Sequence, residues 1–181
     1  DRVAARYLEL NFNRDELADA AGGEDGAAGG EPEVGRYGDR RAEIVEAWFE
    51  DEAGERARTV PNGQRCAICF TARFREPVAD PLFGVVLADD RGTPVFEASN
   101  VLAPASGRFD AGAETTVRIA FDCVLSSGRY EATPAIAHGG SGVAWIDRRE
   151  RFASVVVAGA RSTDAVLDLP FDLEVGARER R

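Results

Sequence analysis

The chain has 181 residues, 44% of them hydrophobic, and a formal net charge of −10 at pH 7. This length suits one domain of ordinary size, and an acidic chain without a stripe of basic residues argues against a nucleic-acid partner. All 22 cationic residues are arginine, which excludes a catalytic lysine and a P-loop lysine. No apolar run approaches the roughly 18 residues of a membrane helix, and the first residues lack the pattern of a signal peptide. Because the chain starts at Asp1 and contains no Met, we expect it to be a fragment.

The N-terminal part differs in composition from the remainder of the chain. Residues 1–19 place apolar side chains at near-helical spacing among good helix formers, which predicts a short helix. Residues 20–36 are rich in Gly, Ala and acidic residues without periodicity, which is typical of a flexible linker. We expect the main domain to span residues 37–175 and a charged tail to cover residues 176–181.

From Tyr37 onward, short runs of period two are separated by Gly, Pro, Asp and Asn. In residues 80–100, for example, alternating apolar residues reach the turn Asp89-Asp90-Arg91-Gly92, which predicts a β-hairpin. Nine strands without intervening helices predict an all-β domain, an antiparallel β-sandwich of immunoglobulin-like or jelly-roll kind. The predicted strands are 41–50, 65–75, 82–89, 94–98, 115–123, 128–138, 143–147, 151–158 and 165–174.

Alternation along these strands assigns their faces. The predicted core positions are Phe83, Val85 and Leu87; Ile68, Phe70, Ala72 and Phe74; Val117, Ile119 and Phe121; Tyr130, Ala132 and Ile136. The opposite faces carry Thr71, Arg73 and Arg75, then Arg118 and Asp122, then Arg129, Glu131 and Thr133. If these strands share one sheet, its outer face is dense in Arg and carboxylate, either as a solvated surface or as a surface for a ligand anion.

Three cysteines, Cys66, Cys69 and Cys123, cannot all pair with one another. The first two form a CxxC, but residues three apart in a strand point to opposite faces, and a zinc site would need further ligands. Buried reduced thiols are the simpler interpretation, with zinc or redox chemistry as the alternative.

Catalysis has little support in this sequence. The only imidazole is His138, beside Gly139-Gly140, and no GxSxG nucleophile motif accompanies it. No GxxxxGK[ST] motif occurs, so nucleotide hydrolysis is not expected in this chain. We therefore expect a domain that is not an enzyme and that holds neither a metal nor a cofactor.

Several segments together resemble the C-terminal domain of Wzt-type ATP-binding subunits of polysaccharide ABC exporters. They are "VPNGQRCAICFTARF", "DPLFGVVLADDRGTPVFEASN", "TVRIAFDCVLSSGRYEATPAI" and the closing Phe152, Val155 and Val157. The resemblance covers about residues 37–175, and the leading "DRVAARYLEL" is similar to the segment that follows the nucleotide-binding domain in such subunits.

The resemblance implies a β-sandwich, commonly a homodimer, at the cytoplasmic face of the bacterial inner membrane. There it would bind the terminus of an undecaprenyl-linked O-antigen glycan and couple recognition to export through the membrane-spanning exporter subunit. ATP and Mg²⁺ would belong to an upstream domain that this chain does not contain. The resemblance assigns no binding residue.

Sugar binding needs an aromatic face and planar polar groups, which directs attention to the two tryptophans. Trp48 is expected to face outward because Val45, Ala47 and Phe49 alternate with it as core positions. Trp145 follows a Gly-rich loop, and for each ring a place in the sandwich core or in a dimer interface is the simpler interpretation. The candidate carbohydrate-binding residues are Trp145, His138 and Asp147, with Asn100 or Arg73 from adjacent strands, and Trp48.

A second hypothesis is a structural domain for homodimerisation or interaction that binds no glycan. The β-branched run at residues 154–159, "SVVVAG", would suit an exposed strand edge that adds to a second copy or to a partner subunit. The two hypotheses differ in one respect, because a purely structural domain would associate but ignore glycans.

Overall fold

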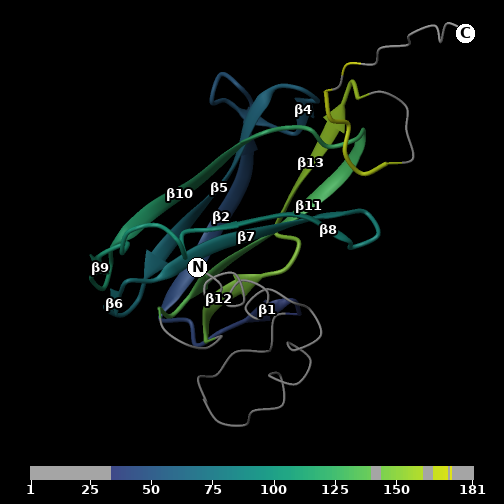
Figure 1. Ribbon diagram of the computed structural model, residues 1–181. Coiled ribbons are helices and arrows are strands. Elements are labelled where there is room, and N and C mark those ends of the chain that lie inside the picture. Colours follow the sequence, from purple (N-terminus) through teal and green to yellow (C-terminus); the bar gives the residue numbers. More distant parts are fainter. Residues whose placement is uncertain (1–33, 140–143, 161–164, 171, 173–181) are drawn as a thin grey trace, which may run out of the picture.

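The computed structural model describes residues 34–139, 144–160, 165–170 and 172, which fold into strands and connecting turns (Figure 1). The predicted helix at 1–19, most of the predicted linker at 20–36 and the predicted tail at 176–181 lie outside the described residues. The strands are β1 (Arg36–Tyr37), β2 (Ala42–Glu50), β3 (Arg56–Ala57), β4 (Thr59–Pro61), β5 (Arg65–Phe74), β6 (Val78–Ala79), β7 (Leu82–Asp89), β8 (Pro94–Ser99), β9 (Arg108–Phe109), β10 (Glu114–Asp122), β11 (Gly128–Ala137), β12 (Trp145–Arg149) and β13 (Ala153–Ala158).

Eight of the nine predicted strands are present, with ends that agree within two residues. The prediction of a strand at 165–174 is wrong for the described part of that range, where Leu167 makes only an isolated bridge to Leu125. Pro170 lacks the backbone N–H that a continuing ladder would need. The sequence pattern missed β1, β3, β4, β6 and β9, because two or three residues are too few to show a period.

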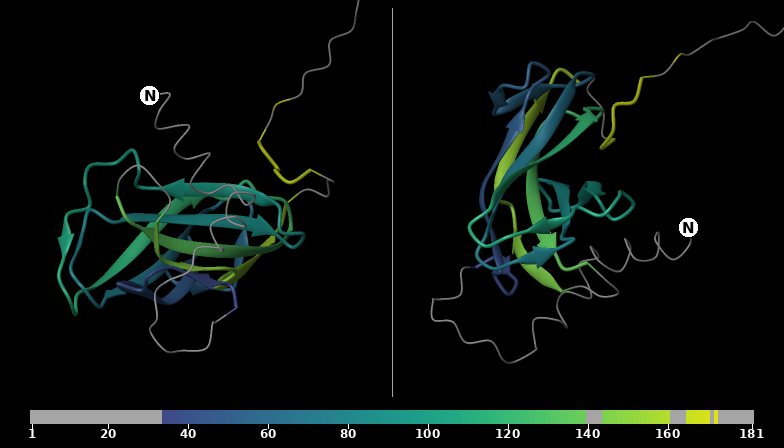
Figure 2. Two further views of the ribbon diagram at one scale, coloured as in Figure 1. Left: turned by 90° about the horizontal axis from the view of Figure 1, so that it is seen from below. Right: turned by 90° about the vertical axis from the view of Figure 1, so that its left-hand side faces the viewer.

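The strands form two main sheets that pack face to face as an all-β sandwich (Figure 2). The four-stranded sheet has the order β10-β5-β2-β3 and is antiparallel throughout. In the seven-stranded sheet, β11 pairs with β7, which pairs with β8, and β13 and β12 lie on the other side of β11. The sheet is completed by β1 on β12 and by β4, which is parallel to β13. β6 and β9 form a separate short pair.

One side of β11 is shared by two strands in succession. Residues 128–132 pair with β13, and residues 135–137 pair with β12. Pro134 lies where the pairing changes from β13 to β12. The carbonyl of Ala132 accepts the Phe152 N–H, so the backbone of Ala132 faces these two strands, and that of Pro134, two residues further, faces the same side. At this position neither β13 nor β12 is paired with β11, so the lack of a backbone N–H in Pro134 costs no ladder hydrogen bond. This explains why a proline is tolerated inside the strand.

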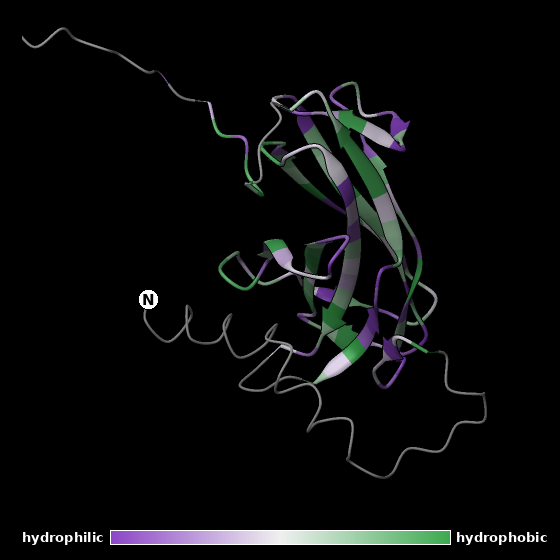
Figure 3. Ribbon diagram, turned by 90° about the vertical axis from the view of Figure 1, so that its right-hand side faces the viewer, coloured by the Kyte–Doolittle hydropathy of each residue, from purple (hydrophilic) through white to green (hydrophobic). Residues whose placement is uncertain are grey.

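The apolar positions of the two sheets meet in the interior, and Figure 3 shows them along the strands. The core predictions for β5, β7 and β11 are confirmed, since all the residues named for these strands are buried. The residues predicted for β10 are only half-buried, because β10 is the edge strand of its sheet. Phe121 of β10 stacks on Phe96 of β8, with ring centroids 4.7 Å apart, and so packs across the two sheets.

A β-bulge corrects the predicted faces of β2. The register between β2 and β5 shifts between Ile44 and Glu46, so Val45 is the extra residue and is only half-buried. Ile44 is fully buried in its place, while Phe49 keeps the predicted core position. Period-two alternation cannot anticipate this inserted residue.

The structure decides two points that the sequence left open. β11 belongs to the other sheet from β5 and β10, so Arg129, Glu131 and Thr133 do not share an outer face with the arginines of those strands. The run 154–159 is not a free edge, because β13 lies between β11 and β4, with Val155 and Val157 buried.

Candidate functional site

Trp48 lies on the outer surface of the four-stranded sheet. On β2 it is opposite Cys69 of β5, which is in turn opposite Arg118 of β10. Phe49, the next residue of β2, points into the core. The strand alternation therefore places the half-buried indole on the outside, as the sequence predicted.

The indole of Trp48 is held by neighbours on two strands. Its ring N–H donates to Glu50 Oε1 at 3.0 Å. The guanidinium of Arg56, on β3, lies over the ring with its Cζ 4.2 Å from the ring centroid, a cation–π contact. Arg56 also donates from both terminal nitrogens to the two carboxylate oxygens of Glu46. These contacts fix the orientation of the ring before any ligand arrives.

The two carboxylates beside Trp48 are both stabilised in their ionised form. Glu50 Oε2 accepts a hydrogen bond from Arg118 Nε at 2.7 Å, and this bond, with that from the Trp48 ring, lowers the pKa of Glu50 below its ordinary value. The hydrogen bond from Arg56 lowers the pKa of Glu46 in the same way. Both groups therefore act as hydrogen-bond acceptors at neutral pH.

A hollow with a volume of about 370 Å³ adjoins the Trp48 ring where β2 and β3 of one sheet meet β13 of the other, and we call it the Trp48 pocket. Its lining residues are Ala47, Trp48, Phe49, Arg56, Ala57, Arg58, Ala153 and Ser154. The hydroxyl of Ser154 accepts a hydrogen bond from Arg129 at 3.3 Å. A second hollow, beside Thr59 and Gln64, has no aromatic ring among its lining residues.

The Trp48 pocket combines an apolar ring with guanidinium and hydroxyl groups, a combination suited to a polar ring-shaped ligand. No carboxylate is among the lining residues of this pocket, because Glu46 and Glu50 lie beside it in ion pairs with Arg56 and Arg118. Within the described residues, no group of three or more His, Cys, Asp or Glu is arranged to hold a metal ion.

Trp145 and His138, two of the predicted site residues, lie near each other at one end of the seven-stranded sheet. Asp39 joins them, because its N–H donates to the Trp145 carbonyl at 3.2 Å and its Oδ2 lies 2.7 Å from His138 Nε2. The guanidinium of Arg148 lies 5.7 Å from the centroid of the Trp145 ring. This end of the sheet is separate from the Trp48 pocket.

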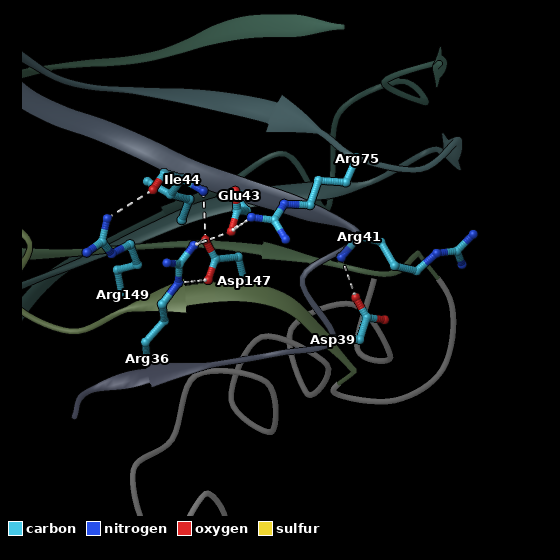
Figure 4. Close-up of polar contacts among 8 residues, drawn as sticks. All are labelled: Arg36, Asp39, Arg41, Glu43, Ile44, Arg75, Asp147 and Arg149. Atoms are coloured by element: carbon cyan, nitrogen blue, oxygen red, sulfur yellow. Dashed lines mark hydrogen bonds and ion pairs between the residues drawn. The ribbon is translucent and has the colours of Figure 1, made fainter. Parts of the chain in front are cut away.

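Asp147, the third member of that predicted group, is fully buried, and its carboxylate points toward Arg36 and Ile44 (Figure 4). Its Oδ1 and Oδ2 accept hydrogen bonds of 2.8 Å from Arg36, and its Oδ2 also accepts the Ile44 N–H at 2.7 Å. A fully buried carboxylate with these partners connects β1, β2 and β12. Its position assigns it to the architecture of the domain, and we leave it out of the candidate site.

Asn100 lies at the same end of the seven-stranded sheet as Trp145 and His138, because it is hydrogen-bonded to Phe83, whose strand β7 pairs with the end of β11. Asn100 closes a loop, because its Oδ1 accepts the Phe83 N–H at 2.8 Å and its Nδ2 donates to the Pro81 carbonyl at 3.4 Å. Arg73 is on the four-stranded sheet and pairs with Glu114 at 2.6 Å. The structure thus brings Trp145, His138 and Asn100 to one end of the seven-stranded sheet, places Arg73 and Trp48 on the four-stranded sheet, and buries Asp147.

The sequence reasoning missed Arg56, Arg58 and Ser154 as neighbours of Trp48. A signal was present in "FEDEAGERAR", residues 49–58, where a short turn after β2 is followed by two arginines at a spacing of two. A tight hairpin there brings Arg56 opposite Glu50, as the observed register shows. The contribution of β13 had no local signal, since it comes from the other end of the chain.

A protein-family model described as the Wzt C-terminal domain matches residues 33–169. No curated protein matches the chain. Among solved structures, the crystal structure of the C-terminal domain of Wzt superposes with a TM-score of 0.70 and 17% sequence identity, covering 80% of this chain and 89% of that one. At this identity the superposition shows the shared fold.

Two other solved structures superpose less well. The alkylpurine DNA glycosylase AlkC of Pseudomonas fluorescens gives a TM-score of 0.42 at 11% identity, covering 66% of this chain and 31% of that chain. A putative beta-galactosidase of Bacteroides fragilis gives 0.37 at 11% identity, covering 64% and 17%. In the part of the chain that the structure describes, no helix is long and apolar enough to cross a membrane.

Proposed function

This chain belongs to the Wzt C-terminal domain family, and from that membership we propose that it is a non-catalytic carbohydrate-binding domain. In this proposal it recognises the terminus of an O-antigen or related cell-surface polysaccharide and couples recognition to export by an ABC transporter. The single observation that carries the proposal is the Trp48 pocket, in which an oriented aromatic ring borders a hollow of about 370 Å³.

The chemistry of the pocket favours a sugar. The apolar face of a pyranose is complementary to an indole ring, and its hydroxyls accept hydrogen bonds from guanidinium groups. Trp48, Arg56 and Arg58 line the pocket and supply these groups, and the Trp48 ring is oriented by its contacts with Glu50 and Arg56. A volume near the lower end of the roughly 300–1,000 Å³ of ligand pockets suits the end of a glycan chain better than a long segment.

The wider assembly follows from the family resemblance. We propose that the domain works as a homodimer at the cytoplasmic face of the inner membrane, attached to an ATP-binding domain and, through it, to a membrane-spanning exporter subunit. The glycan would reach the pocket as an undecaprenyl-linked chain. None of these partners requires a cofactor in this domain.

The test is a titration of the folded domain with the O-polysaccharide of its own organism and with an unrelated glycan as control. The chain has two tryptophans, so a Trp145→Phe background leaves Trp48 as the only indole that reports binding. In the same assay, monitored by saturation-transfer NMR, Trp48→Ala and Arg58→Ala should each weaken binding at least about tenfold. Arg91→Ala, on the exposed hairpin turn between β7 and β8, should leave it unchanged.

Each result decides a separate point. Saturable binding of its own glycan that survives both pocket substitutions would keep the function and move the site away from Trp48. No binding at millimolar chain ends by a folded, dimeric protein would overturn the proposal in favour of a structural homodimerisation domain. Shortening of the glycan chain during incubation would instead indicate an enzyme.

A further inference from the structure

Cys66 and Cys123 lie side by side in the core although they are 57 positions apart in the sequence. Cys66 is on β5 opposite Phe121 of β10. Cys123 directly follows β10, and its N–H donates to the Gln64 carbonyl at 2.9 Å, which continues the same register by one pair. The two cysteines are therefore diagonal neighbours on the core-facing side of two adjacent strands. Both side chains belong to one buried apolar cluster.

The two sulfur atoms are in direct contact. The thiol of Cys66 donates a hydrogen bond to the sulfur of Cys123, which raises the pKa of Cys66 and lowers that of Cys123 to about 7. A backbone hydrogen bond from Leu125 contributes to the lowered pKa of Cys123. In this buried pair the proton is held on Cys66, and Cys123 is the sulfur favoured as a thiolate.

Cys69 differs from both of these residues. It points to the opposite face of β5, beneath Trp48 and Glu50, where burial raises the pKa of its thiol to about 12. The CxxC spacing of Cys66 and Cys69 would suggest that these two form a redox pair. Their opposite directions on one strand exclude that pairing while β5 is intact.

We propose that Cys66 and Cys123 are a redox modification site and form an intramolecular disulfide when the folded domain meets a peroxide. The Cys123 thiolate attacks one peroxide oxygen, the O–O bond breaks, and the released hydroxide takes up a proton as water. The sulfenic acid left on Cys123 is then attacked by the Cys66 sulfur, which loses its proton as a second water departs. Two thiols are oxidised, one peroxide is reduced, and atoms and electrons balance.

The bond would attach the edge strand β10 to β5 at the end where β10 leaves its sheet. The chain beyond Cys123 pairs with the C-terminal segment, since Ser126 N–H donates to the Val166 carbonyl and Asp168 N–H to the Val124 carbonyl. A disulfide at this point closes a long loop, which stabilises the folded state by restricting the unfolded chain. Oxidation should therefore raise the urea midpoint of the domain, and a thiol reductant should reverse the change.

The experiment uses hydrogen peroxide on the folded Cys69→Ala protein, followed by blocking of free thiols and tryptic digestion without reduction. Cleavage after arginine gives peptides 66–73 and 119–129, and the Cys69→Ala change removes the second thiol from the first peptide. The expected product is the cross-linked pair of these peptides, absent in Cys66→Ala and in Cys123→Ala. Circular dichroism before and after oxidation reports whether the domain stays folded.

Two results would overturn the proposal. One is a folded protein in which both thiols remain open to alkylation after peroxide treatment. The other is a cross-link that forms as fast in urea as in the native state, because the folded structure would then not promote the disulfide. Because neither thiol lines the Trp48 pocket, the outcome is independent of glycan binding.

Discussion

Asp147 and Arg36 form a buried ion pair with two hydrogen bonds of 2.8 Å, from Arg36 Nε to Oδ1 and from Nη2 to Oδ2. The carboxylate also accepts the Ile44 N–H, at the point where β2 bulges. Arg36 further contacts Glu43 at 3.5 Å, and Glu43 pairs with Arg75 at 2.7 Å. This network joins β1, β2 and β12 with Arg75, the residue that follows β5 (Figure 4).

Neutralising Asp147 should therefore destabilise the domain strongly. Asp147→Asn leaves the buried charge of Arg36 without its main partner, and losing one member of a buried pair costs about 3–5 kcal/mol. The measurement is urea denaturation followed by circular dichroism. Asp122→Asn is the matched control, because Asp122 pairs with Arg65 on the exposed surface, where a pair contributes about 0–1 kcal/mol. Equal, small effects of the two substitutions would contradict the structural role given to Asp147.

Gly38→Ala should be far more damaging than Gly54→Ala. Both glycines have positive φ, +127° and +80°, so each substitution carries a backbone cost of about 1–2 kcal/mol. A Cβ on Gly38 would also come within 2.5 Å of the Ile146 backbone, whereas a Cβ on Gly54 meets nothing within 4 Å. Overpacking adds about 1–3 kcal/mol at Gly38 alone, which thermal unfolding of the two variants can resolve.

Lowering the pH should change the fluorescence of Trp48. Hydrogen bonds from Arg118 and Trp48 depress the pKa of Glu50 below its ordinary 4.5, so the stability they give is complete above pH 4.5 and is lost as the pH falls through the lowered value. Protonation would release the Trp48 ring from its acceptor. In a Trp145→Phe background, we expect an emission change below pH 4.5 that Glu50→Gln abolishes. A transition centred above pH 4.5 would mean that the pKa of Glu50 is raised, which would contradict this prediction.

Removing the hydroxyl of a buried tyrosine should lower the free energy of unfolding more than removing that of an exposed tyrosine. Tyr130 Oη donates to the Ser126 carbonyl at 2.9 Å in the core, and burial raises its pKa. Tyr130→Phe leaves that carbonyl unsatisfied and should cost about 1–3 kcal/mol. Tyr37→Phe, on the exposed face of β1, should change the free energy of unfolding by less than about 0.5 kcal/mol in the same denaturation assay.

The sandwich could be predicted because burial leaves a period-two pattern in each long strand. β5 is the clearest case, with Ile68, Phe70 and Phe74 all buried as expected. The bulge at Val45 could not be predicted, since it depends on the Asp147 carboxylate that accepts the Ile44 N–H from a strand about 100 residues away. Local alternation contains no information on such a partner.

The candidate site was predicted only in part, for the same reason. The outward direction of Trp48 follows from its neighbours in β2, but its partners come from β3, β10 and β13. Asp147 shows the opposite error. Its residue type and its place near Trp145 favoured a ligand contact, whereas the pairing of β1 with β12 buries it against Arg36. The order of strands in the sheets determines both the partners of Trp48 and the burial of Asp147, and the sequence of a single strand does not reveal that order.

The position of Pro134 also has a consequence for how the sheet opens. Because β13 and β12 bond to different halves of β11 on either side of a residue that donates no hydrogen bond, losing one pairing does not require losing the other. The amide hydrogens of β12 and β1 should therefore exchange with solvent independently of those of β13 and β4. β7, which pairs with β11 from Tyr130 to Ala137, is the strand that couples the two halves.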